Sequence, residues 1–424
     1  MSRYLIVSSD CHAGLPTIEY REYLDPRYRA TFDESVRRAE AARAAMGDGM
    51  GIMDPEFARQ WEAENEEGLR GGWDATHRDK ELDADGVAGE VLFPVSDAVA
   101  GSTSAPFGAG LSMSADVEPE LMLAGARAHN RWLTELCAVA PERRAGVALA
   151  PILDDPHAAV AEIEWARDNG LRGGILIPSL WGKYPPYFDE RYDPVWAACQ
   201  ALDMPVHTHS GAAGGEYGDN IGLYTTETTW WSARPLWFLI WSGVFERYPQ
   251  LKFAVTECLI SWVPELLWRM DTGYLREHGS KKLGHNLERK LTMKPSEYFD
   301  RNCFMGASTM KRREIALRYE IGVGNIMWGN DFPHPEGTWP HTTQWLRSAF
   351  SDVPEDETRQ MLGTTAAQVY NFDVDALAPL VARIGPTPED LGQAAGVADK
   401  WLEAKRIGRH WLTDIDPVPL TTLA

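Results

Sequence analysis

The chain has 424 residues, 44% of them apolar and 24% charged, which is typical of globular proteins and excludes a disordered or fibrous chain. Its 62 acidic and 41 basic residues give a formal net charge of −21 at pH 7. This negative charge disfavours binding to nucleic-acid phosphates or to an anionic membrane surface, so we expect neither as a partner.

The cysteines and the N-terminus indicate a cytoplasmic protein. The N-terminal sequence MSRYLIVSSDCH lacks the apolar core of a secretory signal, and no stretch approaches the ~18 apolar residues of a membrane span. The five cysteines are scattered and never spaced C-x-x-C, which disfavours disulfides and thiolate zinc sites and fits a reducing compartment. They are Cys11, Cys137, Cys199, Cys258 and Cys303.

Short apolar runs alternate with helical patterns along most of the chain. Eight strands are predicted at Tyr4–Asp10, Gly89–Pro94, Gly146–Pro151, Gly173–Pro178, Met204–His209, Lys252–Glu257, Asn302–Gly306 and Ile326–Asp331. Helices are predicted near Pro119–Val139, from Asp155-Pro156 to Asn169-Gly170, and near Asp193–Leu202, Arg234–Arg247, Ile260–Met270 and Arg312–Tyr319. Strands that alternate with helices indicate βαβ units and a parallel sheet, and eight of them indicate an α/β fold closed into a (β/α)₈ TIM-like barrel.

Three segments do not follow this alternation. Residues 22–85 form a charged, helical insertion after the first strand, which we interpret either as a lid over the barrel mouth or as a dimer arm. Gly211–Thr229 is predicted to be a glycine-rich loop, and Val374–Ala424 a helical extension with an amphipathic helix near Pro388–Arg406. We therefore divide the chain into a barrel over residues 1–373 and a C-terminal extension over residues 374–424.

Metal-binding residue types follow or end four of the predicted strands. The first ends at Asp10 and His12 and the fifth at His207 and His209, and both pairs have the i, i+2 spacing that places side chains on one face. Glu257 ends the sixth strand and Asp331 the eighth. Catalytic residues of barrel enzymes come from such carboxyl ends, and imidazole with carboxylate suits zinc, iron or manganese.

Each of these residues also has a purely structural interpretation. His207 and His209 are equally compatible with core histidines, and strand-end carboxylates such as Glu257 and Asp331 often cap the following helix. Ligand-type residues nevertheless occur at the ends of four predicted strands, in the order that a barrel requires, and this coincidence favours a metal site. The other histidines are interpreted as surface or structural (His129, His157, His278, His285, His410) or as intermediate (His77, His334, His341).

Taken together, these segments resemble the amidohydrolase superfamily, in the branch that includes aminocarboxymuconate semialdehyde decarboxylase and related metal-dependent hydrolases. The resemblance runs from Tyr4 to Asp373. It rests on an ordered set of motifs, namely SSDCHAG, DADGVAGEVLFP, PVWAACQALDMPVHTHSG, LIWSGVFERYPQLKFAVTE, MWGNDFPHPEGTWP and LGTTAAQVYNFD.

The resemblance implies one divalent metal ion, held by Asp10, His12, His209 and Asp331. The family often has His-x-His at the first strand and histidine at the end of the sixth, where this chain has Asp-x-His and Glu257. Glu257 is therefore a further ligand, a general base or a residue that orients an imidazole. Its carboxylate is expected to make the site more anionic and to disfavour an anionic reacting group.

Two reactions fit this ligand set. Hydrolysis of an amide, ester or thioester is the favoured one, with metal-activated water, Asp331 as base and His207 stabilising the oxyanion. The alternative is metal-dependent, non-oxidative decarboxylation of an aromatic or unsaturated carboxylic acid, for which Arg234 or Arg269 would supply a cation near the carboxylate. A non-catalytic binding barrel is a third alternative, disfavoured by the complete ligand set.

The substrate is expected to be a small molecule, and its identity is left open. Four of the 17 tryptophans, Trp181, Trp230, Trp231 and Trp339, follow predicted strands. They indicate either an apolar, aromatic or polycyclic substrate, or simple packing in the core or in an oligomer interface. Zinc is the preferred metal, with iron and manganese as alternatives, and a homodimer is the expected assembly.

Overall fold

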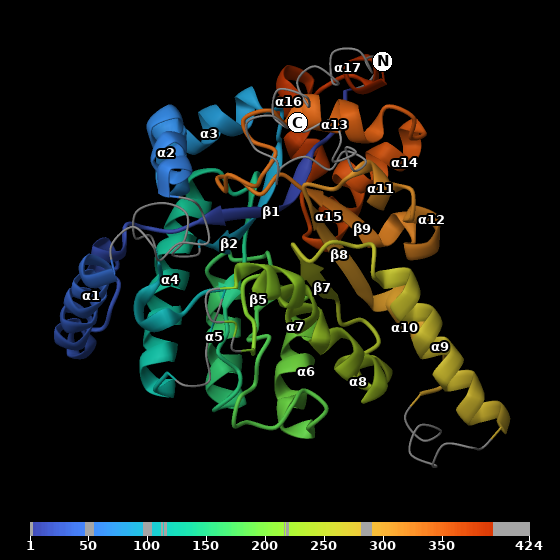
Figure 1. Cartoon of the computed structure of the whole chain (residues 1–424), viewed down its shortest axis with the longest axis horizontal. Coiled ribbons are helices and arrows are strands. Elements are labelled where there is room, and N and C mark those ends of the chain that lie inside the picture. The colour runs from blue at the N-terminus through green and yellow to red at the C-terminus, as the bar shows by residue number, and fades with distance from the viewer. Residues whose placement is uncertain are drawn as a thin grey trace.

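The structure is a computed structural model that describes residues 3–46, 55–95, 104–111, 113, 117–215, 217, 220–280 and 291–392. Nine parallel strands line its centre, and helices surround them (Figure 1). The strands are β1 (Val7–Ala13), β2 (Gly89–Pro94), β3 (Arg144–Gly146), β4 (Ala148–Leu149), β5 (Ile175–Leu176), β6 (Val206–His209), β7 (Phe253–Thr256), β8 (Cys303–Ser308) and β9 (Ile326–Gly329). This is the expected TIM-like barrel.

The barrel closes although its strands fall into a sheet of three, β1-β2-β3, and a sheet of six, β4 to β9. One junction is at Val147, whose N–H donates to the Leu92 carbonyl at 2.9 Å, while the next N–H, of Ala148, donates to Gly174 at 2.9 Å. β3 and β4 therefore form one third strand that changes partner midway and begins two residues before the predicted start at Gly146. At the other junction β1 pairs with the segment after β9 through a parallel bridge between Cys11 and Phe332.

Helices follow the strands as the alternation predicts, and cover the outside of the barrel (Figure 1). The longer ones are α4 (Pro119–Val139), α5 (Pro156–Asp168), α6 (Asp193–Ala201), α7 (Ile221–Trp241), α9 (Val263–Ser280), α10 (Pro295–Asn302) and α13 (Thr342–Phe350). Shorter ones are α8 (Val244–Arg247), α11 (Arg312–Ile315), α12 (Arg318–Ile321), α14 (Glu355–Arg359) and α15 (Thr365–Val369). The Asp155 carboxylate caps α5 by accepting from the N–H groups of His157 and Ala158.

The loop predicted at Gly211–Thr229 is wrong over its second half. Helix α7 begins at Ile221 and continues through Pro235, so the helix predicted from Arg234 starts thirteen residues too late. The hydroxyl of Thr226 donates to the carbonyl of Gly222 at 2.7 Å and so satisfies its own polar group within the helix. A proline inside a helix removes one backbone bond without ending it when packing holds both sides.

The described residues of the insertion form three α-helices, α1 (Pro26–Met46), α2 (Pro55–Leu69) and α3 (Ala75–Ala84). In Figure 1, α1 projects from the body of the molecule, whereas α2 and α3 lie near β1. α2 packs on the segment after β9, since the ring of Trp61 meets that of Trp339 edge-on at 5.6 Å between centroids. A role as lid or dimer arm stays a prediction.

Beyond the barrel, α16 (Val374–Ile384) and α17 (Pro388–Gly392) begin the C-terminal extension. Most of the amphipathic helix predicted near Pro388–Arg406 lies outside the described residues, as do His285 and His410. A search of the described residues finds no helix that is both long and apolar enough to span a membrane.

Candidate metal centre

The structure brings five of the six predicted site residues together at the carboxyl ends of β1, β6, β7 and β9. Asp10 and His12 are both inside β1, because the strand extends three residues beyond its predicted end. His209 ends β6, Glu257 directly follows β7, and Asp331 comes two residues after β9. The alternation of strand side chains therefore aims these groups into one space inside the barrel mouth.

One group of potential ligands joins β1 to β6. The Nε2 atom of His209 is 3.1 Å from Asp10 Oδ1, and Nε2 of His12 is 3.4 Å from the same oxygen. All three side chains are completely buried. The other ring nitrogen of His12 lies 2.8 Å from the Pro94 carbonyl, and that of His209 lies 2.9 Å from the Ser210 carbonyl. These carbonyls fix the rings with Nε2 turned toward the shared space.

A second group joins β1 to the segment after β9. His12 Nε2 lies 3.1 Å from Asp331 Oδ1, and His334 Nδ1 lies 2.9 Å from that same oxygen. The rings of His12 and His334 stack with centroids 3.9 Å apart. His12 Nε2, both Asp331 oxygens and both His334 nitrogens are buried without a hydrogen-bond partner among the residues the structure describes.

These orphaned atoms provide the test of whether the residues fit a metal ion. Buried polar groups are normally satisfied, and leaving one unpaired costs about 1–3 kcal/mol. Here the unpaired atoms are imidazole nitrogens and carboxylate oxygens, and the ligand atoms of each group of three lie within 4.8 Å of one another. Their chemistry and convergence fit a divalent cation.

The third group consists of carboxylates at the more open side of the site. Glu257, Asp331 and Glu336 approach one another, and the Glu257 side chain is 23% exposed whereas that of Asp331 is 1% exposed. Glu257 Oε2 lies 3.5 Å from Nδ1 of His209. Both Glu257 and Asp331 have positive φ angles, 56° and 60°, so a tight left-handed turn after each strand presents the carboxylate.

The electrostatics follow from crowding four carboxylates with three imidazoles. Burial alone would raise the pKa of Asp10, but His209 and His12 outweigh it and hold that pKa well below its usual range. Burial alone would lower the pKa of His12, and the carboxylates of Asp10 and Asp331 instead hold it well above its usual value. Burial together with Asp331 and Asp10 raises the pKa of Glu257 well above its ordinary value. The cluster therefore attracts positive charge.

His207 is the one predicted site residue that belongs to none of these groups. Its Nε2 lies 2.9 Å from the Gly173 carbonyl, its ring stacks on Tyr370, and the Phe93 ring contacts both His207 and His209. Burial lowers its pKa to about 3, so the ring is neutral. These contacts are those of a core histidine, one of the two interpretations that the sequence left open.

Sequence analysis did not place His334 and Glu336 in the site. The sequence analysis interprets His334 as intermediate and does not single out Glu336. The signal was their spacing from Asp331 within the motif DFPHPE. The N–H of His334 donates to the Asp331 carbonyl at 2.8 Å, a turn that folds both side chains back toward the strand end.

Fold and site together define an amidohydrolase-type barrel enzyme. The model of the amidohydrolase family matches residues 96–372, and the chain belongs to that family. The match starts after β2, so the ligand-type residues of β1 rest on the structure rather than on the family model.

Among curated proteins, the chain is similar to gamma-resorcylate decarboxylase of Rhodococcus jostii, with 26% identity over 58% of this chain and 77% of that protein. It is also similar to 6-methylsalicylic acid decarboxylase of Penicillium expansum, with 24% identity over 60% of this chain and 78% of that protein. Solved structures share the fold. That of 5-carboxyvanillate decarboxylase from Sphingomonas paucimobilis has a TM-score of 0.61 and 22% identity over 87% of this chain and 99% of the other.

These relatives correct the expected reaction. Hydrolysis was favoured, but the curated relatives are named as decarboxylases of aromatic acids, which agrees with the alternative instead. They give no support to thioester cleavage, zinc or iron, and a similar dihydroxybenzoic acid decarboxylase from Polaromonas (TM-score 0.57, 17% identity over 88% of this chain and 98% of the other) was solved with manganese. The oxyanion role expected of His207 belonged to hydrolysis and is withdrawn with it.

Proposed function

We propose that the chain catalyses the metal-dependent, non-oxidative decarboxylation of an aromatic carboxylic acid. The observation that carries the proposal is its similarity to gamma-resorcylate and 6-methylsalicylic acid decarboxylases over more than three quarters of their lengths. The converging buried carboxylates and imidazoles support it, because the chemistry needs a cation to hold an anionic substrate in a buried site.

Asp10, His12, His209 and Asp331 are proposed to hold one divalent ion, with His334 next to them. When bound, this ion supplies the positive charge that attracts the substrate carboxylate and compensates the negative charge that the site gathers. Residues of the chain then orient the substrate. The Phe93 ring, fully buried and 4.7 Å from the His209 ring, forms an apolar wall beside the ligands and keeps water from one side of them.

Decarboxylation breaks the bond between the ring carbon and the carboxylate and forms a C–H bond at the same carbon. The electron pair of the broken bond takes up one proton, so each turnover consumes a proton and releases carbon dioxide. The proton donor must be recharged from water after every cycle. We propose that the carboxyl of Glu257 is that donor, because it is partly exposed whereas the neighbouring Asp331 is almost completely buried.

The protonation of Glu257 also bears on the expectation about the charge of the site. Its carboxylate was expected to make the site more anionic and to repel an anionic reacting group. Burial and the nearby Asp331 and Asp10 raise the pKa of Glu257, which favours the neutral acid. A neutral carboxyl does not repel an aromatic carboxylate and carries the proton that the reaction needs.

The proposal is tested by incubating the Mn²⁺-loaded protein with 2,6-dihydroxybenzoate (gamma-resorcylate), 6-methylsalicylate and 5-carboxyvanillate, followed by chromatography and detection of carbon dioxide. We expect at least one acid to lose its carboxyl group, with activity lost on chelation and restored by Mn²⁺. In D₂O the product should carry one deuterium at the carbon that held the carboxyl. Consumption of none of these acids by a metal-loaded protein would contradict the proposal.

A further inference from the structure

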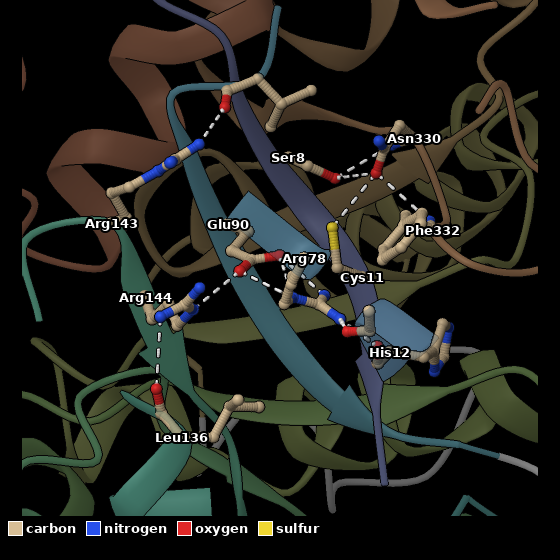
Figure 2. Close-up of polar contacts among 12 residues, drawn as sticks. Ser8, Cys11, His12, Arg78, Glu90, Leu136, Arg143, Arg144, Asn330 and Phe332 are labelled. Atoms are coloured by element: carbon tan, nitrogen blue, oxygen red, sulfur yellow. Dashed lines mark hydrogen bonds and ion pairs between the residues drawn. The ribbon is translucent and has the colours of Figure 1, made fainter. Parts of the chain in front are cut away.

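A fully buried arginine connects the insertion to the metal centre. Arg78 lies on α3, and its side chain has no solvent exposure. Its Nε donates to the Glu90 carboxylate at 2.8 and 2.9 Å, and its Nη2 donates to the same carboxylate at 2.7 Å. Its Nη1 donates to the carbonyls of Gly71 and His12 at 2.8 and 2.9 Å (Figure 2). The Arg78 guanidinium thus links helix α3 to β1, to β2 and to the turn of the insertion that contains Gly71.

The same guanidinium also contacts the segment that carries Asp331. It lies over the ring of Phe332, 5.0 Å from the centroid, and Phe332 directly follows Asp331. The backbones of the two segments are bonded as well, since His12 N–H donates to the Phe332 carbonyl at 2.7 Å and Asp331 N–H donates to the Asp10 carbonyl at 2.9 Å. Arg78 therefore contacts two of the segments that carry the ligand cluster, β1 through the His12 carbonyl and the segment after β9 through the Phe332 ring.

Burying this charge is tolerated because its partner is buried with it. Glu90 has no exposure either, and it also accepts from Arg144 Nε at 3.3 Å. An unpaired buried ion would be strongly unfavourable, so each charge depends on its partner at this position. Arginine suits such a position because it binds the carboxylate through two nitrogens and two carbonyls through the third, which needs four N–H donors where lysine has three.

We infer that Arg78 is a positioning residue, which holds His12 and the segment of Asp331 and Phe332 at the spacing that a divalent ion requires. Through Arg78, helix α3 of the insertion would then determine the affinity for that ion. The inference rests on the proposed function only in taking this cluster as the metal site. It assigns the insertion a part in building the site, distinct from a lid or a dimer arm.

Arg144 provides a matched control. It too is fully buried and bonded to Glu90, but its other donors reach the Leu136 carbonyl and Asp79 (Figure 2). In the described part of the chain, its side chain has no hydrogen bond to the segments that carry the ligands. Arg78→Lys and Arg144→Lys each keep the positive charge and weaken the same network. If the network only stabilises the fold, both changes should have the same effect on metal binding.

The experiment measures the Mn²⁺ dissociation constant and the Mn²⁺ electron paramagnetic resonance spectrum of both variants, beside circular dichroism and urea unfolding. We expect Arg78→Lys to weaken Mn²⁺ binding about 10–100-fold, the usual range for partners that orient ligands, and to change the zero-field splitting. Arg144→Lys should keep the wild-type affinity and spectrum at a comparable loss of stability. The inference would be overturned if both variants kept the wild-type Mn²⁺ affinity, or if both lost Mn²⁺ affinity to the same extent.

A second variant covers the case in which Arg78→Lys does not fold. Phe332→Leu removes the ring under the guanidinium and leaves every hydrogen bond of Arg78 in place, and we expect a smaller but measurable loss of Mn²⁺ affinity. An unchanged affinity there would overturn the inferred contact with the Asp331 segment. A wild-type chain that binds no Mn²⁺ overturns both proposals, whereas one that binds Mn²⁺ and decarboxylates no aromatic acid overturns only the proposed reaction.

Discussion

Two arginines show that two flanks of the barrel are built in different ways. On the flank of β1, β2, β9 and α3, Arg78 is surrounded by oxygen atoms that accept its hydrogen bonds. On the flank of β5, β6, β7 and α7, Arg234 lies among the rings of Trp181, Trp231 and Phe238, at 4.7, 5.5 and 5.0 Å from their centroids. No hydrogen bond or ion pair of Arg234 is found within the described part of the chain.

The different surroundings of the two arginines indicate that the two flanks have different roles. Directional hydrogen bonds to carbonyls fix backbone positions, as metal ligands require, whereas contacts between a cation and aromatic faces are broad and tolerate shifts. The first flank, which we call the polar flank, carries Asp10, His12 and Asp331. The second, the aromatic flank, carries His209 and the partly exposed Glu257. We therefore expect the polar flank, which carries three of the four proposed ligands, to contribute most of the metal affinity, and the aromatic flank to determine proton delivery and substrate contact.

The largest expected effect separates Glu257 from Asp331. Glu257→Gln keeps the shape of the side chain but removes the transferable proton, so kcat should fall on the order of 10²–10⁴ at full Mn²⁺ occupancy. Asp331→Asn should instead lose most of its Mn²⁺. Metal content and single-turnover rates measured on the same samples decide between the two. If the Asp331→Asn protein keeps its Mn²⁺ and loses turnover, the proton donor is Asp331 on the polar flank and not Glu257.

The next effect compares the two arginines directly. Arg78→Leu removes the closest cation of the buried Glu90 and leaves it the longer contact with Arg144, so it should lower the free energy of unfolding by about 3–5 kcal/mol. Arg234→Leu leaves no known carboxylate unpaired and should cost about 1 kcal/mol, the order of a cation–π contact. Urea unfolding of both variants measures this. Similar losses would show that the two flanks do not differ in the way we describe.

A smaller effect is expected from the close approach of β9 to β1. A Cβ atom on Gly329 would lie 2.7 Å from the Cβ of Asp10, so Gly329→Ala must displace a ligand strand. We expect a loss of about 1–3 kcal/mol in unfolding free energy together with weaker Mn²⁺ binding. Gly110→Ala is the control, because a Cβ there meets nothing within 4 Å. Unchanged Mn²⁺ affinity in Gly329→Ala would argue against a rigid polar flank.

The smallest effect concerns pH and a histidine behind the polar flank. His129 is buried beside the Tyr20 hydroxyl, and burial lowers its pKa to about 3. The unfolded chain takes up a proton near its ordinary pKa of about 6.5, and the folded chain does not. Stability should therefore be complete above pH 6.5 and fall as the pH is lowered toward 3, by about 1 kcal/mol between pH 6.5 and 5.5.

The His129→Gln variant isolates this contribution. The difference in unfolding free energy between wild type and variant should shrink as the pH falls through this window, because only the wild type loses stability by binding the proton when unfolded. A difference that does not change with pH would mean that His129 binds its proton equally in the folded and the unfolded chain, and would contradict the lowered pKa.

Much of the fold was predictable because its signals are local. α4 was predicted at its observed bounds, and the Asp155-Pro156 pair gave the start of α5. The strand ends were found because buried parallel strands are short apolar runs followed by polar residues. The first thirteen residues of α7 were missed because the glycines near its start suggested a loop. The third strand divides because it changes its hydrogen-bonding partner at Val147.

The sequence predicted those site residues that lie at the end of a strand, because the periodic pattern of a strand marks where it ends. Asp10, His12, His209, Glu257 and Asp331 are each attached to a predicted strand end, and the structure brings them together. His334 and Glu336 enter the site through a tight turn after β9, for which no periodic signal exists. Arg78 was hidden in a charged insertion, where one buried arginine looks the same in sequence as many solvated ones.

The bridge between Cys11 and Phe332 also bears on how the chain is made. The ligands of the polar flank come from opposite ends of the barrel sequence, and Ser8 and Asn330, which are hydrogen-bonded beside them, are 322 positions apart. During synthesis β1 leaves the ribosome first and must wait for β9 before Asp331 exists. A nascent chain that stops before β9 therefore lacks the complete centre, and uptake of the ion by all four ligands would report that the barrel has closed.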